Sequence, residues 1–89
     1  MAKYEVVVAD SFIEDAAALY SDTVFNQLQH FILLLETSPE IGSPRVRASL
    51  KAIYGEGIRK IALSSFLIIY RFKNNRVDVL ALVYGPSVK

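Results

Sequence analysis

The last third of the chain carries its strongest pattern, three β-rich runs joined by two short polar turns. Residues 58–85 read IRKIALSSFLIIYRFKNNRVDVLALVYG, with Ser64-Ser65 between the first two runs and residues 73–76 between the last two. Runs of β-branched and aromatic residues separated by such turns are typical of antiparallel hairpins. The pattern therefore predicts a three-stranded meander.

Both faces of this predicted sheet are apolar. In the middle run, strict alternation separates two sets of side chains. One face carries Phe66, Ile68, Tyr70 and Phe72, and the other carries Leu67 and Ile69. In the last run the same rule places Val77, Val79, Ala81 and Val83 opposite Leu80, Leu82 and Tyr84. A sheet that is apolar on both sides needs two covers, and the rest of the chain is expected to supply one. Leu67 and Ile69 are therefore predicted to bind a partner.

The first half of the chain predicts one strand and a helical hairpin. Residues 4–9 (YEVVVA) form a short β-rich run, and Ser11 and Glu14 have the spacing of a capping box for a helix from Phe12 to about Tyr20. Residues 21–23 offer new N-cap residues, which predicts a break. A second helix is expected over residues 24–37, where apolar positions recur at helical spacing. Its phenylalanines, Phe25 and Phe31, are expected in the hairpin core together with Phe12.

Residues 40–57 are the least determined segment. Val46, Leu50, Ile53 and Tyr54 are compatible with one amphipathic turn or with two. The element order is therefore strand, two helices, an irregular connection and three strands. This order indicates an α+β fold in a single domain spanning residues 1–89, with a helical hairpin packed on one face of a small, mostly antiparallel sheet.

The composition of the chain excludes several kinds of metal site. The 89 residues include no cysteine, and His30 is the one histidine, which excludes thiolate sites and multi-histidine sites within one chain. No metal and no cofactor are expected. No apolar run approaches the roughly 20 residues that span a bilayer, and the N-terminus lacks the features of a signal peptide, so we expect a cytoplasmic protein without a membrane partner.

Charge is unevenly distributed along the chain. The net charge is +1, but acidic residues are concentrated before residue 41 and basic residues after residue 44. The basic half is compatible with a local anion-binding patch or with ordinary solvated charge on strand edges and turns.

Several elements in order resemble a known family. They are a first strand with Tyr4 and Val6, the helical hairpin, Pro39-Glu40-Ile41-Gly42, Ile58-Arg59-Lys60-Ile61, Phe66-Leu67-Ile68-Ile69-Tyr70-Arg71, Val77-Asp78-Val79-Leu80 and Tyr84-Gly85. In this order they resemble the RelE/ParE superfamily, the toxins of bacterial type II toxin–antitoxin modules. The ParE side commonly reads P-x-x-G, hR-x-h (h apolar), Y-x-h-h-Y-R and V-x-h-h-x-h-x-H-G. Here Phe66 replaces the first tyrosine of the third motif, and Tyr84 replaces the histidine.

The resemblance implies one of several activities. RelE-like members cut mRNA on the ribosome with a cluster of basic residues, for which the candidates here are Arg59, Lys60, Arg71 and Tyr84. However, Leu67 stands where a nuclease would carry an arginine, and residues 86–89 replace a longer basic tail. ParE-like members poison DNA gyrase without a known catalytic centre, and the chain is closer to them. A non-toxic interaction module of the same fold is the third alternative.

The resemblance also suggests roles for single residues and partners. Arg59 and Arg71 match family positions and are predicted to bind the target, although either could instead pair with acids. Tyr70 and Tyr84 could stack on a base or donate a proton, or they could simply pack and make one hydrogen bond. The expected partner is a cognate antitoxin, whose disordered C-terminal segment folds onto an apolar surface of the toxin. Homodimer formation through the same surface is the alternative.

Overall fold

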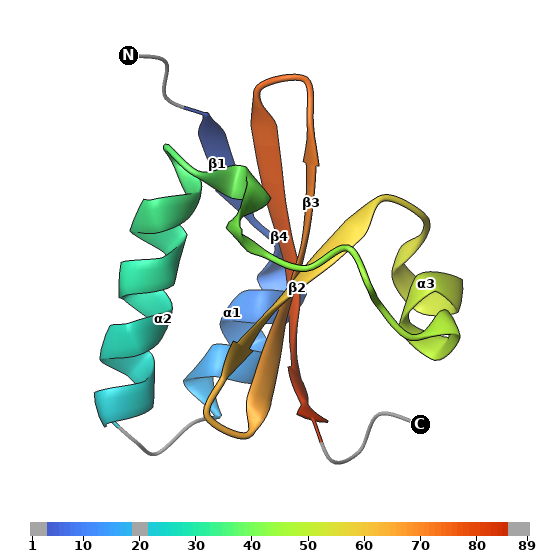
Figure 1. Cartoon of the computed structure of the whole chain (residues 1–89). Coiled ribbons are helices and arrows are strands. Elements are labelled where there is room, and N and C mark those ends of the chain that lie inside the picture. Colours follow the sequence, from blue (N-terminus) through green and yellow to red (C-terminus); the bar gives the residue numbers. More distant parts are fainter. Residues whose placement is uncertain (1–3, 19–21, 86–89) are drawn as a thin grey trace.

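The computed structural model describes residues 4–18 and 22–85 (Figure 1). In chain order the elements are β1 (Glu5–Val8), α1 (Asp10–Ala17), α2 (Asp22–Leu35), the 3-10 helix η1 (Pro39–Ile41), α3 (Ala48–Tyr54), β2 (Ile58–Leu63), β3 (Phe66–Lys73) and β4 (Arg76–Tyr84). The α+β class and the order of elements are as predicted. The predicted end of the first helix at Tyr20 and the break at Ser21 lie outside the described residues.

The four strands form one mixed sheet in the order β1-β4-β3-β2. The predicted meander is confirmed, because β2 pairs with β3 and β3 with β4 in antiparallel fashion. Ser64, Asn74 and Asn75 have positive φ, as tight hairpin loops require. β1 instead runs parallel to β4, since the chain crosses the sheet through the helical hairpin before the meander begins.

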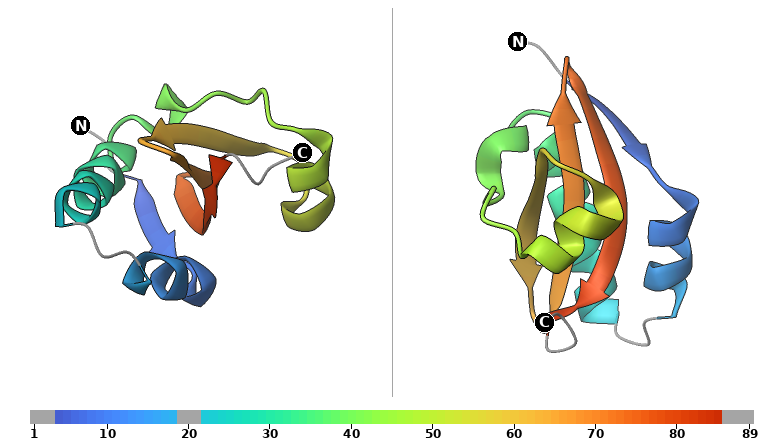
Figure 2. Two further views of the ribbon diagram at one scale, coloured as in Figure 1. Left: turned by 90° about the horizontal axis from the view of Figure 1, so that it is seen from below. Right: turned by 90° about the vertical axis from the view of Figure 1, so that its right-hand side faces the viewer.

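The helical hairpin covers one face of the sheet, as predicted (Figure 2). Phe12 and Ala16 of α1 and Leu28 and Leu35 of α2 are buried against this face. The sheet contributes Ile61, Leu63, Ile68, Tyr70, Val77, Val79 and Leu82 to the same cluster. This is the larger of the two cores, and it fixes the position of both hairpin helices.

The other face of the sheet is covered by α3, which corrects the prediction of an uncovered face. Val46 and Leu50 pack there against Ile58, Ile69 and Ala81. Ile69 is fully buried, so it is not exposed to a partner in this structure. The cover comes from the segment whose conformation the sequence left open, because Val46 and Leu50 lie on the side of α3 and its preceding loop that faces the sheet.

A β-bulge in β4 changes which side chains face each layer. Ile69 pairs with Ala81 and Tyr70 with Val79, so Leu80 is an additional residue on β4. As a result Ala81 packs beneath α3, whereas Leu82 joins the hairpin core. Strict alternation is therefore correct for β3 and for Val77 and Val79, but wrong for Ala81 and Leu82.

The free edge of β4 is occupied by α1. Pairing with β1 ends at Val79. Beyond it, the Ser11 hydroxyl donates to the Leu80 carbonyl at 2.8 Å, and the Leu82 amide donates to the Asp15 carboxylate at 3.4 Å. The predicted capping box is therefore wrong, because Ser11 lies inside α1 and bonds to the sheet instead of the first turn.

Candidate functional site

Tyr70 anchors the segment between α2 and α3 from beneath. Its side chain is fully buried on β3, where the hydroxyl donates to the Pro39 carbonyl and accepts from the Gly42 amide at 2.9 Å. Burial raises the pKa of Tyr70, so the hydroxyl stays protonated and able to donate. A Cβ on Gly42 would overlap this hydroxyl and lie 2.9 Å from the Lys60 carbonyl oxygen, which explains the need for glycine. The Tyr70 side chain therefore packs in the core and makes its hydrogen bonds to the backbone of this segment.

Arg59 binds the same segment from β2. Its Nη1 donates to the Gly42 carbonyl at 2.8 Å and to the Glu40 carbonyl at 3.4 Å. Ser43 and Lys60 add two backbone hydrogen bonds between the segment and β2. The motifs around Pro39–Gly42, Arg59 and Tyr70 therefore form one physical unit. Target binding by Arg59 stays a prediction, and the structure adds a role in holding this loop.

The four candidate catalytic residues do not form one cluster, although Lys60 and Arg71 lie on the same face of neighbouring strands. On β2, Arg59 alternates with Lys60, so their side chains leave opposite faces of the sheet. Arg71 lies on the face covered by α3. Tyr84 pairs with Phe66, five residues from Arg71 along β3, which is about 17 Å. Its ring contacts Phe66 edge-on at 5.7 Å and is half exposed.

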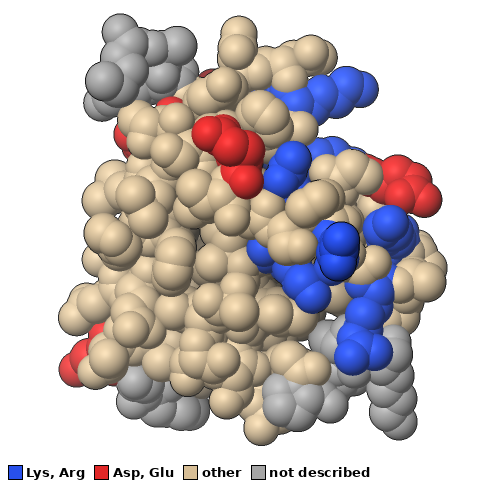
Figure 3. Space-filling view, viewed as in Figure 1, with Lys and Arg blue, Asp and Glu red and all other residues tan. Residues whose placement is uncertain are grey.

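Basic side chains gather on the side of the molecule that carries α3 and β2 (Figure 3). Arg71 is half-buried there, with Nη1 3.6 Å from the position of a Cβ on Gly55. In residues 4–18 and 22–85, no hydrogen bond or ion pair engages Arg71. Lys60 and Lys51 are half-buried in the same region, and Lys51 lies 3.9 Å from Glu56.

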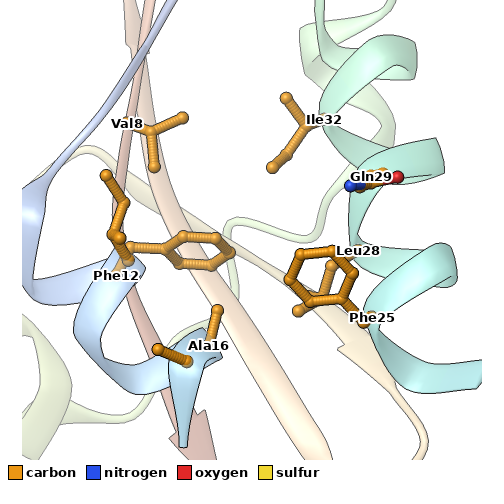
Figure 4. A pocket seen from close by; sticks show the side chains of 9 residues that line it. Val8, Phe12, Ala16, Phe25, Leu28, Gln29 and Ile32 are labelled. Carbon is orange, nitrogen blue, oxygen red and sulfur yellow. The ribbon is translucent and has the colours of Figure 1, made fainter. Parts of the chain in front are cut away.

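An apolar pocket of about 400 Å³ opens between the two hairpin helices, and sequence reasoning missed it. Phe12 and Phe25 point toward one another across it from α1 and α2 (Figure 4). Ile13 and Phe25 remain 53% and 44% exposed, so the prediction that Phe25 is core is wrong. The sequence signal for this pocket was the pairs of adjacent apolar residues Phe12-Ile13 and Ala16-Ala17. They make the apolar stripe of the helix wider than packing on the sheet requires, which indicates a second apolar surface.

His30 is exposed on α2 with its ring beside Phe31. Within the described ranges, no three His, Cys, Asp or Glu side chains are grouped as metal ligands. None of the helices seen in these ranges has the length and apolarity needed to cross a membrane. Leu67 is half-buried at the edge of the core beneath α3, and a partner-binding role for it stays a prediction.

Solved structures share this fold. The chain matches a RelBE-type toxin–antitoxin complex from Mycobacterium tuberculosis with TM-score 0.72 and 18% identity, covering 94% of this chain and 93% of that one. The intact RelBE complex of E. coli matches with TM-score 0.69 and 20% identity over 90% and 94% of the two chains. The chromosomal ParDE system of P. aeruginosa matches with TM-score 0.59 and 14% identity over 92% and 96%. No curated protein sequence matches the chain.

The architecture is thus that of RelE/ParE toxins, a mixed four-stranded sheet between a helical hairpin and a third helix. The family model for the ParE toxin of the type II toxin–antitoxin system parDE matches residues 6–85. The chain belongs to this family.

Proposed function

We propose that the protein is a cytoplasmic ParE-like toxin that inhibits DNA gyrase by binding it and is neutralised by a cognate antitoxin. The observation that carries this proposal is that Tyr84 lies at the opposite end of the sheet from Arg59, Lys60 and Arg71, and that Arg59 leaves a different face of the sheet from Lys60 and Arg71. RNA cleavage needs cationic and proton-transferring groups around one phosphate, where they can stabilise the charge that develops in the transition state. Separation by about 17 Å supports a binding function instead.

The pocket between α1 and α2 supports an antitoxin site on the hairpin. The RelBE and ParDE structures that share the fold are toxin–antitoxin systems. A pocket walled by Phe12, Ile13, Phe25 and Ile32 suits the apolar side of an amphipathic segment laid between two helices. This location replaces the buried Ile69 as the proposed antitoxin contact, and Leu67 becomes a secondary candidate.

The docking proposal can be tested with one matched pair of variants. Phe25→Asp places a charge on the wall of the pocket, whereas Leu33→Asp places the same charge on α2 at a 63% exposed position outside it. We expect Phe25→Asp to weaken antitoxin binding at least tenfold in calorimetry, by roughly 1.4 kcal/mol or more, and Leu33→Asp to leave it unchanged. Equal affinities would refute the site. Loss of self-association instead of antitoxin binding would assign the pocket to a homodimer.

The target proposal requires two assays on the purified protein. We expect it to inhibit plasmid supercoiling by gyrase and to stabilise cleavage complexes. Arg71→Gln should weaken this inhibition without unfolding the protein, because no side-chain hydrogen bond or ion pair among the described residues depends on Arg71. Intact supercoiling together with antitoxin binding would identify a non-toxic interaction module.

A ribosome-dependent endonuclease is the second candidate, because the RelE folds match with TM-scores of 0.69 to 0.72, above the 0.59 of the ParDE match. These likenesses are below 25% identity and describe the fold. Site-specific mRNA cleavage on translating ribosomes, lost in Tyr84→Phe, would favour this alternative over gyrase inhibition.

A further inference from the structure

The apolar pocket between α1 and α2 lies in a part of the chain that has no cationic side chain. Residues 4–44 contain seven acidic residues and no lysine or arginine, although the whole chain carries a net charge of +1. The acids are Glu5, Asp10, Glu14, Asp15, Asp22, Glu36 and Glu40. The helical hairpin therefore combines an apolar surface with charge of a single sign.

Three of these acids stand beside the walls of the pocket. Asp10 lies one turn before Ile13 on α1, and Asp22 lies one turn before Phe25 on α2, so both carboxylates neighbour apolar side chains of the pocket. Glu14 follows Ile13 directly. All three acids are exposed, and in residues 4–18 and 22–85 no ion pair engages them. Asp10, Glu14 and Asp22 are called the acidic rim below.

Helix stability does not account for the charge of the acidic rim. The helix dipole favours acids in a first turn, as at Asp10 and Asp22, but it equally favours lysine or arginine in a last turn. Neither α1 nor α2 has a basic residue in its last turn, and Glu14 places an acid in that of α1. Charge of one sign around an apolar surface is instead an arrangement that selects a partner of the opposite sign.

The size of the pocket indicates the form of that partner. Its volume of about 400 Å³ is more than twice the roughly 150 Å³ that holds a benzene ring, so it accepts at least two large apolar side chains. Phe25, Gln29 and Ile32 line it along two turns of α2, or about 10 Å of helix (Figure 4). This length matches the i, i+3, i+4 and i+7 side chains of an amphipathic helix laid in a groove.

The acidic rim also disfavours a second copy of the hairpin as the occupant. A two-fold dimer through the pocket would bring the acidic rims of both copies together, and like charges across an interface are unfavourable. We propose that the pocket accepts a cationic amphipathic helix, whose apolar side fills the space between α1 and α2 while its lysines or arginines lie against the acidic rim. This inference rests on the proposed antitoxin site and specifies the chemistry of the segment that occupies it.

The probes are two designed helical peptides of about 15 residues. Both carry leucine at positions i, i+3, i+4 and i+7, and their charged positions are all lysine in one peptide and all glutamate in the other. Binding to the purified full chain is measured by fluorescence anisotropy at about 50 mM and about 200 mM salt. We expect the lysine peptide to bind roughly tenfold more tightly than the glutamate peptide at the lower salt concentration, and this preference to shrink at the higher one.

The double variant Glu14→Gln/Asp22→Asn neutralises two residues of the acidic rim and leaves the apolar walls intact. It removes one acid from the last turn of α1 and one from the first turn of α2, so its effects on the two helix dipoles oppose each other. We expect it to bind the lysine peptide roughly fivefold more weakly. Glu5→Gln/Glu40→Gln is the matched control, because it removes the same charge from exposed positions that do not line the pocket. It should bind the lysine peptide as the wild type does.

The outcomes separate the charge of the occupant from the existence of the docking site. Equal binding of the two peptides, with both weakened by the uncharged substitution Phe25→Ser, would keep the docking site and overturn the cationic occupant. A lysine peptide that does not bind the wild type would overturn the inference, and antitoxin calorimetry would then decide the docking site separately. An equal loss in Glu5→Gln/Glu40→Gln would indicate general electrostatic attraction and would also overturn it. A dimer in sedimentation that Phe25→Ser dissociates would assign the pocket to a second copy.

Discussion

Tyr70→Phe removes a single oxygen atom from the centre of the fold, and its effect can be worked out from the contacts. The hydroxyl serves two buried backbone groups, the Pro39 carbonyl and the Gly42 amide. Both residues are buried, so water does not replace the lost partner. Each unsatisfied buried group costs about 1–3 kcal/mol, and we expect the free energy of unfolding to fall by about 2–4 kcal/mol. For a domain of this size that corresponds to a decrease in Tm of roughly 10–25 °C.

The measurement is urea and thermal unfolding followed by circular dichroism. Tyr54→Phe is the matched control, since no hydrogen bond to the Tyr54 hydroxyl is found within the described residues and the same atom is removed from a half-buried ring. It should change stability by less than about 0.5 kcal/mol. A Tyr70→Phe protein as stable as the control would refute the view that this hydroxyl holds the loop between α2 and α3.

The same hydroxyl predicts a pH dependence with a defined sign. Burial raises the pKa of Tyr70 above its ordinary value of 10.0, so above that pH the unfolded chain loses this proton before the folded chain does. Its contribution to stability is complete below about pH 10 and is lost as the pH rises through the folded pKa. The difference in stability between the wild type and Tyr70→Phe should therefore shrink in alkaline solution. A difference that grows above pH 10 would contradict the assignment.

Three further predictions concern residues whose contacts differ. Gly42→Ala should lower the free energy of unfolding by about 1–3 kcal/mol in urea titrations, because its Cβ meets the Tyr70 hydroxyl and the Lys60 carbonyl. Ile69→Lys should leave the chain unfolded by circular dichroism, since the side chain is fully buried, whereas Leu67→Lys at the half-buried edge should remain folded. Arg59→Ala should lower the free energy of unfolding by about 1–2 kcal/mol in the same urea titrations, because it removes two hydrogen bonds to carbonyl groups. Arg71→Ala should lower it by less than about 0.5 kcal/mol. The opposite ranking would show that Arg71, and not Arg59, stabilises the fold.

The sequence was sufficient where local signals and burial agree. The meander follows from polar turns between β-rich runs, and the two faces of β3 follow from the period of a strand. The hairpin helices follow from apolar spacing, and their packing on one face follows from the number of layers a small domain can form. The family resemblance was equally readable, because its motifs are the residues that hold one loop: Pro39, Gly42, Arg59 and Tyr70.

The sequence was insufficient where a single residue, or a contact between residues far apart in the chain, determines the local structure. The bulge at Leu80 exchanges the faces of Ala81 and Leu82, and nothing in the alternating run marks it. α3 is a short helix that is stabilised mainly by the sheet it covers, so residues 40–57 gave no clear helical pattern. Lys51 of α3, Arg59 of β2 and Phe72 of β3 line one concavity, and their proximity depends on the register between β2 and β3.

The contacts of α1 with the edge of β4 have a consequence for solubility. The segment Leu80-Ala81-Leu82-Val83 is uncharged, β-prone and without proline, which is the profile of a sequence that templates intermolecular sheet growth. Ser11 and Asp15 occupy hydrogen-bonding positions that an incoming strand would use. α1 therefore blocks this edge of β4 against pairing with another chain. A chain in which this helix is displaced presents a strand edge that can nucleate aggregates.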